Sequence, residues 1–353
     1  MPKLKTQDLH AFVRDIFMAL RAPRASAECV TGNLIRAQIS GHPSHGVLRV
    51  AQYSQEIQSG QLDPIADPEL LRETSVTALI DGKRGFGQVI ASQALQVALE
   101  KVREHGLAAV GTTRSYHIGR LGDYAEQSAR KGFIALLWAN GMVPPGRVTP
   151  FGGKKGVLGT NPMAAGIPAD ETGAQIVVDF ATAAIAEGKI RVARAKGEPI
   201  PAGMAIDSAG NECTDPEQFY QGGAILPFGG HKGYGLSILC DVLAGLITGS
   251  ATPCMPDYEP SNSLLMILLD PERFRPLPEF RRDVLAFAST VKGIPPAHGH
   301  EEVLLPGEPE YRAACANRDT VDVVDSTWTS LCEIGQSTGV AQPAEVESND
   351  RPV

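Results

Sequence analysis

The chain has 353 residues, a formal net charge of −8, 43% hydrophobic residues and 20% charged residues. This is the composition of a globular protein with enough apolar material for more than one core. No long basic run is present, which argues against a nucleic-acid binder and against a membrane-surface protein. The lysines near the N-terminus precede no uncharged apolar stretch, and the six cysteines show no CxxC pair. We therefore expect a cytoplasmic protein without a disulfide framework.

Helical periodicity dominates the first 60 residues. Apolar residues recur at helical spacing from 6 to 20 and from 26 to 41, and a third helix is expected from 43 to 60. The middle of the chain then alternates between strand and helix patterns. Strands are expected at 75–82, 107–113, 133–140, 174–182 and 263–270, and helices at 87–106, 119–132, 184–197, 232–249, 280–293 and 326–338. The pattern predicts a mixed α/β region between helical ends.

The stretch "GHPSHGVLR" (41–49) gathers polar side chains with possible chemical roles. If it opens a helix, His45, Arg49 and Tyr53 lie four residues apart and share one face. Arginine can hold a carboxylate through two hydrogen bonds, and histidine can exchange a proton near neutral pH. Ser44 is placed to orient the imidazole. Spacing alone leaves open the alternative of a helix start with ordinary polar residues.

Two other chemistries fit the same stretch less well. A zinc site through His42 and His45 needs a third ligand that no nearby spacing supplies, although His117 is a distant candidate. A serine hydrolase needs a GxSxG elbow, which the sequence lacks.

Three further stretches are candidates for ligand contact. In "TTRSYHIGRLGDYAE" (112–126), His117 follows a strand and precedes a helix, where ligands often bind in α/β proteins. "PFGGKKGVLGTNPMAAGIP" (150–168) looks like a glycine-rich loop that includes Thr160 and Asn161. "LPFGGHKGYGLS" (226–237) leads His231 and Lys232 into a helix, whose first amides suit a phosphate. Each stretch has a plainer alternative: a turn histidine for His117, a turn between strands for 150–168, and a glycine-rich helix entry for 226–237.

The segment "GFGQVIA" (85–91) superficially resembles the dinucleotide fingerprint GxGxxG. Position 90 is isoleucine where the third glycine belongs, and no acidic residue ends a strand about 20 residues later. The Rossmann fingerprint is therefore absent here.

Six stretches occur together in a family order: "GHPSHGVLR", "RSYHIGRLGDYAE", "FGGKKGVLGTNPMAAGIP", "VVDFATAAIAEGKI", "FGGHKGYGLS" and "LLPGE". In this combination the sequence resembles the second malate/L-lactate dehydrogenase family, from about Leu4 to about residue 335. That family also holds ureidoglycolate dehydrogenase, 2,3-diketogulonate reductase, sulfolactate dehydrogenase and Δ1-piperideine-2-carboxylate reductase. The resemblance implies an α/β (α+β) fold: a non-Rossmann NAD(P)-binding domain with a largely antiparallel sheet, flanked by helical regions. It also implies a homodimer with the active site near the subunit contact.

The resemblance assigns roles to individual residues. His45 matches the proton-donating histidine, Ser44 its partner and Arg49 the carboxylate-binding arginine. His117 matches a residue described either as the acid/base or as part of the nicotinamide site. Substrate contacts fall on Tyr53 and Thr160. Cofactor contacts fall on His117, Ile118, Gly119, Arg120, Leu121, Asp179, Phe180, Ala181, Glu187, Gly188, His231, Lys232, Gly307 and Glu308.

The same resemblance implies a division of the chain and a cofactor. We expect a helical region at 1–72 carrying catalytic residues and an NAD(P)-binding domain at 73–310 with a helical insertion at about 185–250. A helix within 311–340 should pack on the N-terminal region, and 341–353 should form a disordered tail. Many members carry a basic residue after "PGE", where this chain has Pro309 and Glu310. An acidic residue there disfavours a 2′-phosphate, so NAD is expected rather than NADP.

The sequence therefore predicts an oxidoreductase that interconverts a small 2-oxo acid and its 2-hydroxy acid, with His45 as the acid/base and Arg49 on the carboxylate. Reduction of a cyclic imine such as Δ1-piperideine-2-carboxylate is an alternative within the same family. A zinc-dependent hydrolase and a non-catalytic binding protein are alternatives from other classes. No metal is expected.

Overall fold

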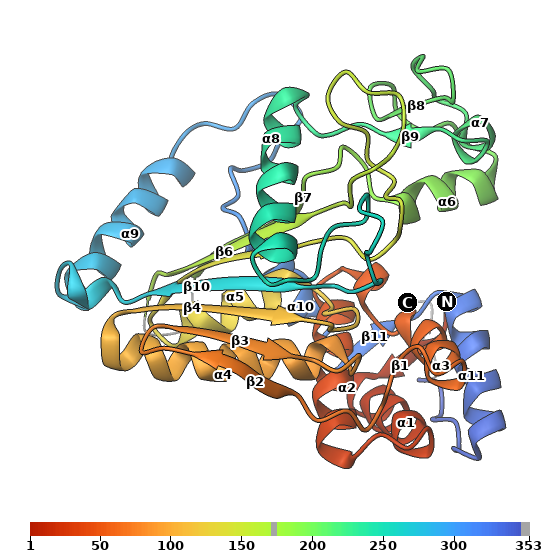
Figure 1. Cartoon of the computed structure of the whole chain (residues 1–353), viewed down its shortest axis with the longest axis horizontal. Helices are drawn as coiled ribbons and strands as arrows, with labels where there is room; N and C mark the ends of the chain where they lie inside the picture. Colours follow the sequence, from red (N-terminus) through yellow and green to blue (C-terminus); the bar gives the residue numbers. More distant parts are fainter. Residues whose placement is uncertain (171–174, 347–353) are drawn as a thin grey trace, which may run out of the picture.

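A seven-stranded sheet forms the centre of the computed structural model, which describes residues 1–170 and 175–346 (Figure 1). The strand order is β2-β3-β4-β10-β5-β6-β7, and β3 with β4 is the one parallel pair of neighbours in this sheet. The prediction of a mixed α/β fold with a largely antiparallel sheet is confirmed. The strands are β2 (Glu69–Glu73), β3 (Thr77–Asp81), β4 (Leu107–Thr113), β5 (Ile134–Ala139), β6 (Pro162–Pro168), β7 (Gln175–Ala181) and β10 (Leu264–Leu269).

The central strand β10 is apolar on both sides because both faces of the sheet are covered. Its residues Leu264, Met266 and Leu268 point into the core formed with α4 (Gly87–His105) and α5 (Leu121–Arg130). The alternate residue Leu265 packs with Trp138, Cys240 and Ala244 on the opposite face. There α8 (His231–Cys240) continues into a π-helical turn, η2 (Asp241–Leu246). The two-residue period of a strand therefore divides one apolar run between two cores.

A second core holds the N-terminal helices together with the last helix. It contains α1 (Thr6–Ala19), α2 (Arg24–Ile39), α3 (Arg49–Gln58) and α11 (Asp325–Thr338). The ring of Phe12 meets that of Trp328 edge to face at 5.9 Å. The short strand β1 (Lys3–Lys5) pairs with β11 (Thr320–Asp322), so the start of the chain lies beside the segment that leads into α11 (Figure 1).

The remaining elements form a smaller lobe and the outer helices. The lobe has its own apolar core and contains α6 (Glu187–Lys196), β8 (Ala205–Ile206), α7 (Pro216–Tyr220) and β9 (Ala224–Ile225). Outside it lie α9 (Leu277–Lys292), α10 (Glu308–Ala316) and the 3₁₀ turns η1 (Pro43–His45) and η3 (Pro271–Arg273). No helix within the described residues is long and apolar enough to cross a membrane.

Three expectations about local structure need correction or restriction. The segment after Asn161, expected to be a glycine-rich loop, is the strand β6. The single helix expected at 43–60 is broken into η1 and α3. Of the disordered tail expected at 341–353, residues 347–353 lie outside the described residues. In the described part, the Val346 amide donates a hydrogen bond to the Lys3 carbonyl at 2.8 Å.

Candidate active site

The spacing predicted that His45 shares a helix face with Arg49 and Tyr53, and this prediction is wrong. His45 ends the 3₁₀ turn η1, and the backbone is extended at Gly46 before α3 begins at Arg49. The break has a packing cause. A Cβ at position 46 would lie 2.3 Å from Oε1 of Gln38, and that oxygen accepts a hydrogen bond from the Val47 amide. The turn is therefore folded against α2 rather than continued as a helix.

The two predicted histidines nevertheless meet, although they come from distant parts of the chain. The rings of His45 and His117 are stacked, with centroids 5.5 Å apart and an interplanar angle of 23°. His117 lies in the connection between β4 and α5. Its Nδ1 is 2.6 Å from Oη of Tyr53, and the same hydroxyl oxygen accepts a hydrogen bond from Nε2 of Gln88 at 2.7 Å. We call these four residues the imidazole cluster.

Tyr53 is fully buried, with its ring against Phe17 and Phe86. The resemblance placed Tyr53 near the substrate. In the structure its hydroxyl is directed to His117 and Gln88, so it contacts the site through His117. Sequence reasoning did not identify Gln88, because a buried glutamine in an apolar helix gives no signal of its partner.

Arg49 and Ser44 lie beside His45. The Ser44 hydroxyl is 3.1 Å from Nδ1 of His45, while the Ser44 carbonyl accepts a hydrogen bond from Nε of Arg49 at 2.7 Å. Nη1 of Arg49 donates to Gln52 one turn further along α3. The guanidinium is thus fixed at one edge and oriented next to the imidazole, as a carboxylate anchor requires.

The environment keeps both imidazoles uncharged at neutral pH. Burial lowers the pKa of His45 to about 3, and the charges of Arg49, His42 and Arg120 act in the same direction. Burial also lowers the pKa of His117 well below its usual value, again with help from Arg49. Perturbed titratable groups gathered at one point are typical of a catalytic site.

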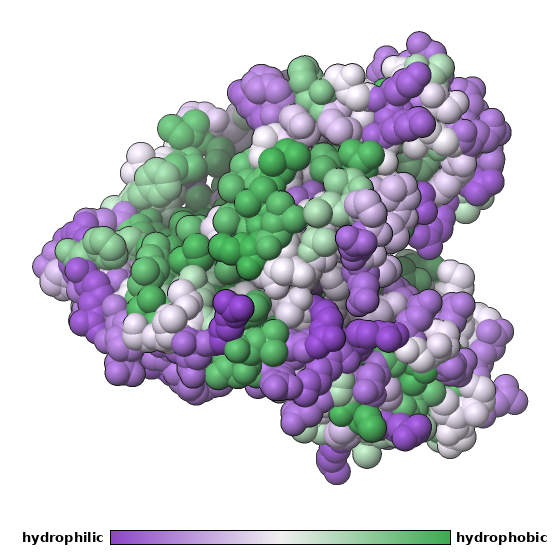
Figure 2. All heavy atoms as spheres, in the orientation of Figure 1, coloured by the Kyte–Doolittle hydropathy of each residue, from purple (hydrophilic) through white to green (hydrophobic). Residues whose placement is uncertain are grey.

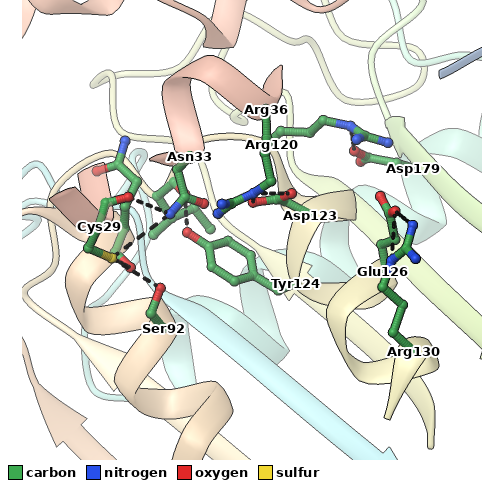
Figure 3. Close-up of polar contacts among 12 residues, drawn as sticks. Cys29, Asn33, Arg36, Ser92, Arg120, Asp123, Tyr124, Glu126, Arg130 and Asp179 are labelled. Carbon is green, nitrogen blue, oxygen red and sulfur yellow. Dashed lines mark hydrogen bonds and ion pairs between the residues drawn. The ribbon is translucent and has the colours of Figure 1, made fainter. Parts of the chain in front are cut away.

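A second group of polar residues surrounds the start of α5, and we call it the ion-pair cluster: Arg36, Asp123, Arg120 and Asp179 (Figure 3). Arg36 of α2 donates from Nε to both carboxylate oxygens of the buried Asp123, at 3.0 and 2.9 Å. Nε of Arg120 lies 3.4 Å from Oδ2 of Asp179, and the same oxygen accepts a hydrogen bond from the Gly122 amide at 2.9 Å. Burial raises the pKa of Asp179, and Arg120 opposes that rise.

Most of the predicted cofactor residues lie around this cluster. Ile118, Gly119, Arg120 and Leu121 form the connection from His117 into α5, and Asp179, Phe180 and Ala181 end β7. Gly307 and Glu308 lie beside β7, because the Val177 amide donates to the Pro306 carbonyl at 3.0 Å. Glu310 lies close by and contacts Nε2 of His42 at 3.3 Å. His42 thereby joins the charged group rather than the imidazole pair.

The other predicted cofactor residues lie in the region of the small lobe. His231 and Lys232 begin α8, and the ring of Phe151 meets that of His231 at 5.9 Å. Phe151 and Gly230 line a cavity of about 590 Å³. Glu187 and Gly188 begin α6, where Glu187 accepts hydrogen bonds from Tyr220 and Arg191. Within the described residues, no hydrogen bond, ion pair or ring contact joins Glu187 or His231 to the imidazole cluster.

Thr160 precedes β6, and its carbonyl accepts hydrogen bonds from the Thr182 amide and hydroxyl at 2.9 and 3.0 Å. The neighbouring Asn161 has a left-handed backbone (φ 42°), and its side chain bonds the Gly141 amide and Ser237. These contacts fix the backbone on which the Thr160 side chain is carried.

A zinc site receives no support from the arrangement of side chains. Across residues 1–170 and 175–346, no group of three or more His, Cys, Asp or Glu side chains is arranged to hold a metal ion. His42 contacts Glu310, while His45 and His117 contact Ser44 and Tyr53.

Comparisons with known proteins identify the family of this chain. The family model for malate/L-lactate dehydrogenase matches residues 4–332. The chain is 35% identical to L-lactate dehydrogenase of Cupriavidus necator, over 97% of this chain and 99% of that protein. The structure of sulfolactate dehydrogenase from Methanocaldococcus jannaschii superposes with a TM-score of 0.88 at 32% identity, covering 98% of this chain and 100% of the other.

A reductase with a different substrate is also similar. Δ1-piperideine-2-carboxylate reductase from Pseudomonas syringae superposes with a TM-score of 0.83 at 28% identity, over 95% of this chain and 100% of that one. The match of the family model along nearly the whole chain decides the classification. The chain belongs to the malate/L-lactate dehydrogenase family.

Proposed function

We propose that this protein is an NAD(P)-dependent oxidoreductase that interconverts a small 2-oxo acid and its 2-hydroxy acid. The observation that carries the proposal is the stacked pair of uncharged imidazoles, His45 and His117, with Arg49 fixed beside them. A 2-hydroxy acid needs a cation for its carboxylate and a proton acceptor for its hydroxyl. Membership in the malate/L-lactate dehydrogenase family supports the same reaction.

In this mechanism Arg49 binds the C1 carboxylate and His45 exchanges a proton with the oxygen on C2. Ser44 orients His45 through Nδ1. His117 and Thr160 lie on either side of the reacting centre. The positive charge of Arg49 helps to lower the pKa of both imidazoles, so a carboxylate bound to Arg49 offsets that charge and raises their affinity for protons. Substrate binding thus prepares the acid/base group.

The nicotinamide cofactor would supply or accept the hydride at C2. The residues around the start of α5 suit a dinucleotide. Arg120 is buried, and its Nε makes no hydrogen bond within the described residues although it lies 3.4 Å from Oδ2 of Asp179. The guanidinium at the start of α5 therefore keeps donors for the negatively charged part of a dinucleotide. Because "GFGQVIA" lacks the third glycine, we propose a non-Rossmann binding mode involving the chain from His117 to Leu121, the end of β7 and the Gly307–Glu308 turn. Glu187, Gly188, His231 and Lys232 would complete it from the small lobe.

We propose NAD as the preferred cofactor. Asp179, Glu308 and Glu310 lie in one neighbourhood beside β7, and Glu310 contributes to raising the pKa of Asp179. Glu308 is itself paired with Lys292, which leaves that cation less available to a 2′-phosphate. The carboxylates in this neighbourhood therefore disfavour the additional 2′-phosphate of NADP.

The quaternary proposal is a homodimer in the cytoplasm. Figure 2 shows a green, apolar area over α8. The exposed large apolar residues of α8, η2 and the position after η2 are Ile238, Leu239, Val242, Leu246 and Ile247. Ile247 alone is 65% exposed. An apolar area of this kind is typical of a protein–protein contact. The family resemblance makes a second copy of this chain the proposed partner.

The test is a substrate panel assayed with NADH and with NADPH. Pyruvate, oxaloacetate and the 2-oxo acid related to sulfolactate are compared with Δ1-piperideine-2-carboxylate. We expect consumption of NADH with at least one 2-oxo acid. Turnover of the cyclic imine alone would favour the second candidate, which the similarity to Δ1-piperideine-2-carboxylate reductase supports. Absence of turnover, together with no thermal shift on adding either cofactor, would overturn the oxidoreductase proposal.

Arg49→Ala tests the carboxylate role. Loss of two charge-assisted hydrogen bonds should lower kcat/KM by about 100-fold, through a higher KM and a lower kcat. Arg72→Ala changes an exposed arginine on β2, the edge strand of the central sheet; it is the matched control and should retain activity. Full activity of Arg49→Ala would exclude Arg49 as the carboxylate anchor.

A further inference from the structure

The segment "GFGQ" (85–88) does not fit the dinucleotide fingerprint, yet it packs directly on the backbone of His117. The Tyr116 amide donates to the Gly85 carbonyl at 3.1 Å. A Cβ at position 87 would lie 2.1 Å from the Tyr116 carbonyl oxygen and 2.5 Å from that of His117. Only glycine allows this approach, because the clash would be with backbone atoms that cannot move aside.

The other two residues of this segment act on Tyr53. The ring of Phe86 packs against that of Tyr53, with centroids 6.3 Å apart. Gln88 is the second residue of α4, is completely buried, and donates from Nε2 to Oη of Tyr53 at 2.7 Å. All four residues therefore contact either the backbone next to His117 or the tyrosine that holds its ring.

The direction of hydrogen bonding along this chain determines where the proton of His117 lies. Because Tyr53 Oη accepts from Gln88, its own proton is available to His117 Nδ1, 2.6 Å away. A neutral imidazole that accepts at Nδ1 carries its hydrogen on Nε2. Within the described residues Nε2 of His117 has no hydrogen-bond partner, so it is the nitrogen that remains available to a ligand.

We propose that Gln88 is a positioning residue that, through Tyr53, fixes His117 as the Nε2–H tautomer. His117 then serves as a hydrogen-bond donor to the C2 oxygen of the substrate. A neutral imidazole with its proton on Nε2 has no lone pair there to accept one. Proton exchange therefore belongs to His45, and the two stacked histidines have different tasks. The task of His117 in the reaction rests on the proposed function, whereas its tautomer follows from the hydrogen bonds alone.

The direct test is nitrogen NMR of protein labelled with ¹⁵N-histidine, with the His117 signal assigned by its absence in His117→Gln. The wild-type protein should show the hydrogen on Nε2 of His117. Gln88→Glu replaces the donor with a carboxylate that accepts from Tyr53, so the hydrogen should move to Nδ1. Gln88→Met removes the interaction and should give a mixture of both tautomers. Gln93→Met, on an exposed position of the same helix, should leave the signal unchanged.

The same variants are then assayed with the best substrate of the panel. Gln88→Glu should lower kcat by about 10- to 100-fold with little change in KM, because an oriented donor to the reacting oxygen is lost while Arg49 still binds the carboxylate. Gln88→Met should fall between Gln88→Glu and the wild type. Cofactor-induced thermal shifts in each variant verify that it is folded.

The outcomes separate this inference from the proposed function. A hydrogen on Nδ1 of His117 in the wild-type protein overturns the inference, even if 2-oxo acids are reduced normally. An unchanged tautomer in Gln88→Glu overturns the role of Gln88. If no substrate of the panel is turned over but the tautomers respond as described, the proposed function fails while the positioning of His117 by Gln88 is supported.

Discussion

The imidazole cluster and the ion-pair cluster are neighbours, but they differ in charge. His45 and His117 are held uncharged by burial and by the nearby Arg49. In the ion-pair cluster, burial opposes the charge of Arg36, but Asp123 outweighs burial and raises the pKa of Arg36. A group that exchanges protons must change its charge easily, whereas a group that holds a fold or an anion must keep its charge. The comparison suggests that the first cluster serves the reaction and the second serves structure and binding.

The largest expected effect is a loss of activity, without a loss of stability, when His45 of the imidazole cluster is replaced. His45→Gln keeps the size and polarity of the side chain but cannot exchange a proton, so kcat should fall by about 10²- to 10⁴-fold. The midpoint of urea unfolding should stay near that of the wild-type protein, because the side chain of His45 is half-buried and makes one hydrogen bond within the described residues. Steady-state kinetics and urea titration of the same preparation measure both. A kcat within threefold of the wild type would assign proton exchange elsewhere.

The ion-pair cluster should show the opposite pattern. Arg36→Met leaves the carboxylate of Asp123, 6% exposed, without its cation, and should lower the free energy of unfolding by about 3 kcal/mol. Adding Asp123→Asn should recover part of the loss, since the unpaired charge is then gone. Urea titration of the two single variants and the double variant gives the coupling between the residues. Additive losses would mean that the pair contributes no net interaction.

The smallest effect concerns pH. The pKa of His45 is lower in the folded protein than in the unfolded chain. Below about pH 6.5, His45 therefore binds a proton in the unfolded chain but stays neutral in the folded protein. Stability should therefore fall as the pH drops from about 6.5 toward 3, by less than about 1.4 kcal/mol per pH unit for this group. Thermal unfolding from pH 7.5 to 4.5 should show a shallower loss in His45→Gln. Identical slopes for the two proteins would contradict the lowered pKa.

Periodicity was sufficient for much of the fold and insufficient for the site. The apolar run at 263–270 predicts β10, because a strand covered on both faces is apolar throughout. The strand β6 was missed because its glycine and prolines resemble a loop. Helical spacing placed His45 on the face of Arg49, and the contact of Gly46 with Gln38 breaks that helix.

The contact between His45 and His117 joins residues 72 positions apart. No local pattern contains such a pairing, and the family resemblance was needed to select both histidines. Neither the local sequence pattern nor the family resemblance identified Gln88, because its role depends on where Tyr53 and His117 lie in space. What the sequence left undecided is therefore set by tertiary packing.

The position of β10 in the sheet has a consequence for synthesis. β10 lies between β4 and β5, yet it follows both of them in the chain by more than a hundred residues. During translation the inner edges of β4 and β5 are both complete while the strand that joins them has not been made. These unpaired edges are open to pairing with other chains. We therefore expect chains that stop before residue 264 to aggregate, and a nascent chain to depend on chaperones until β10 emerges from the ribosome.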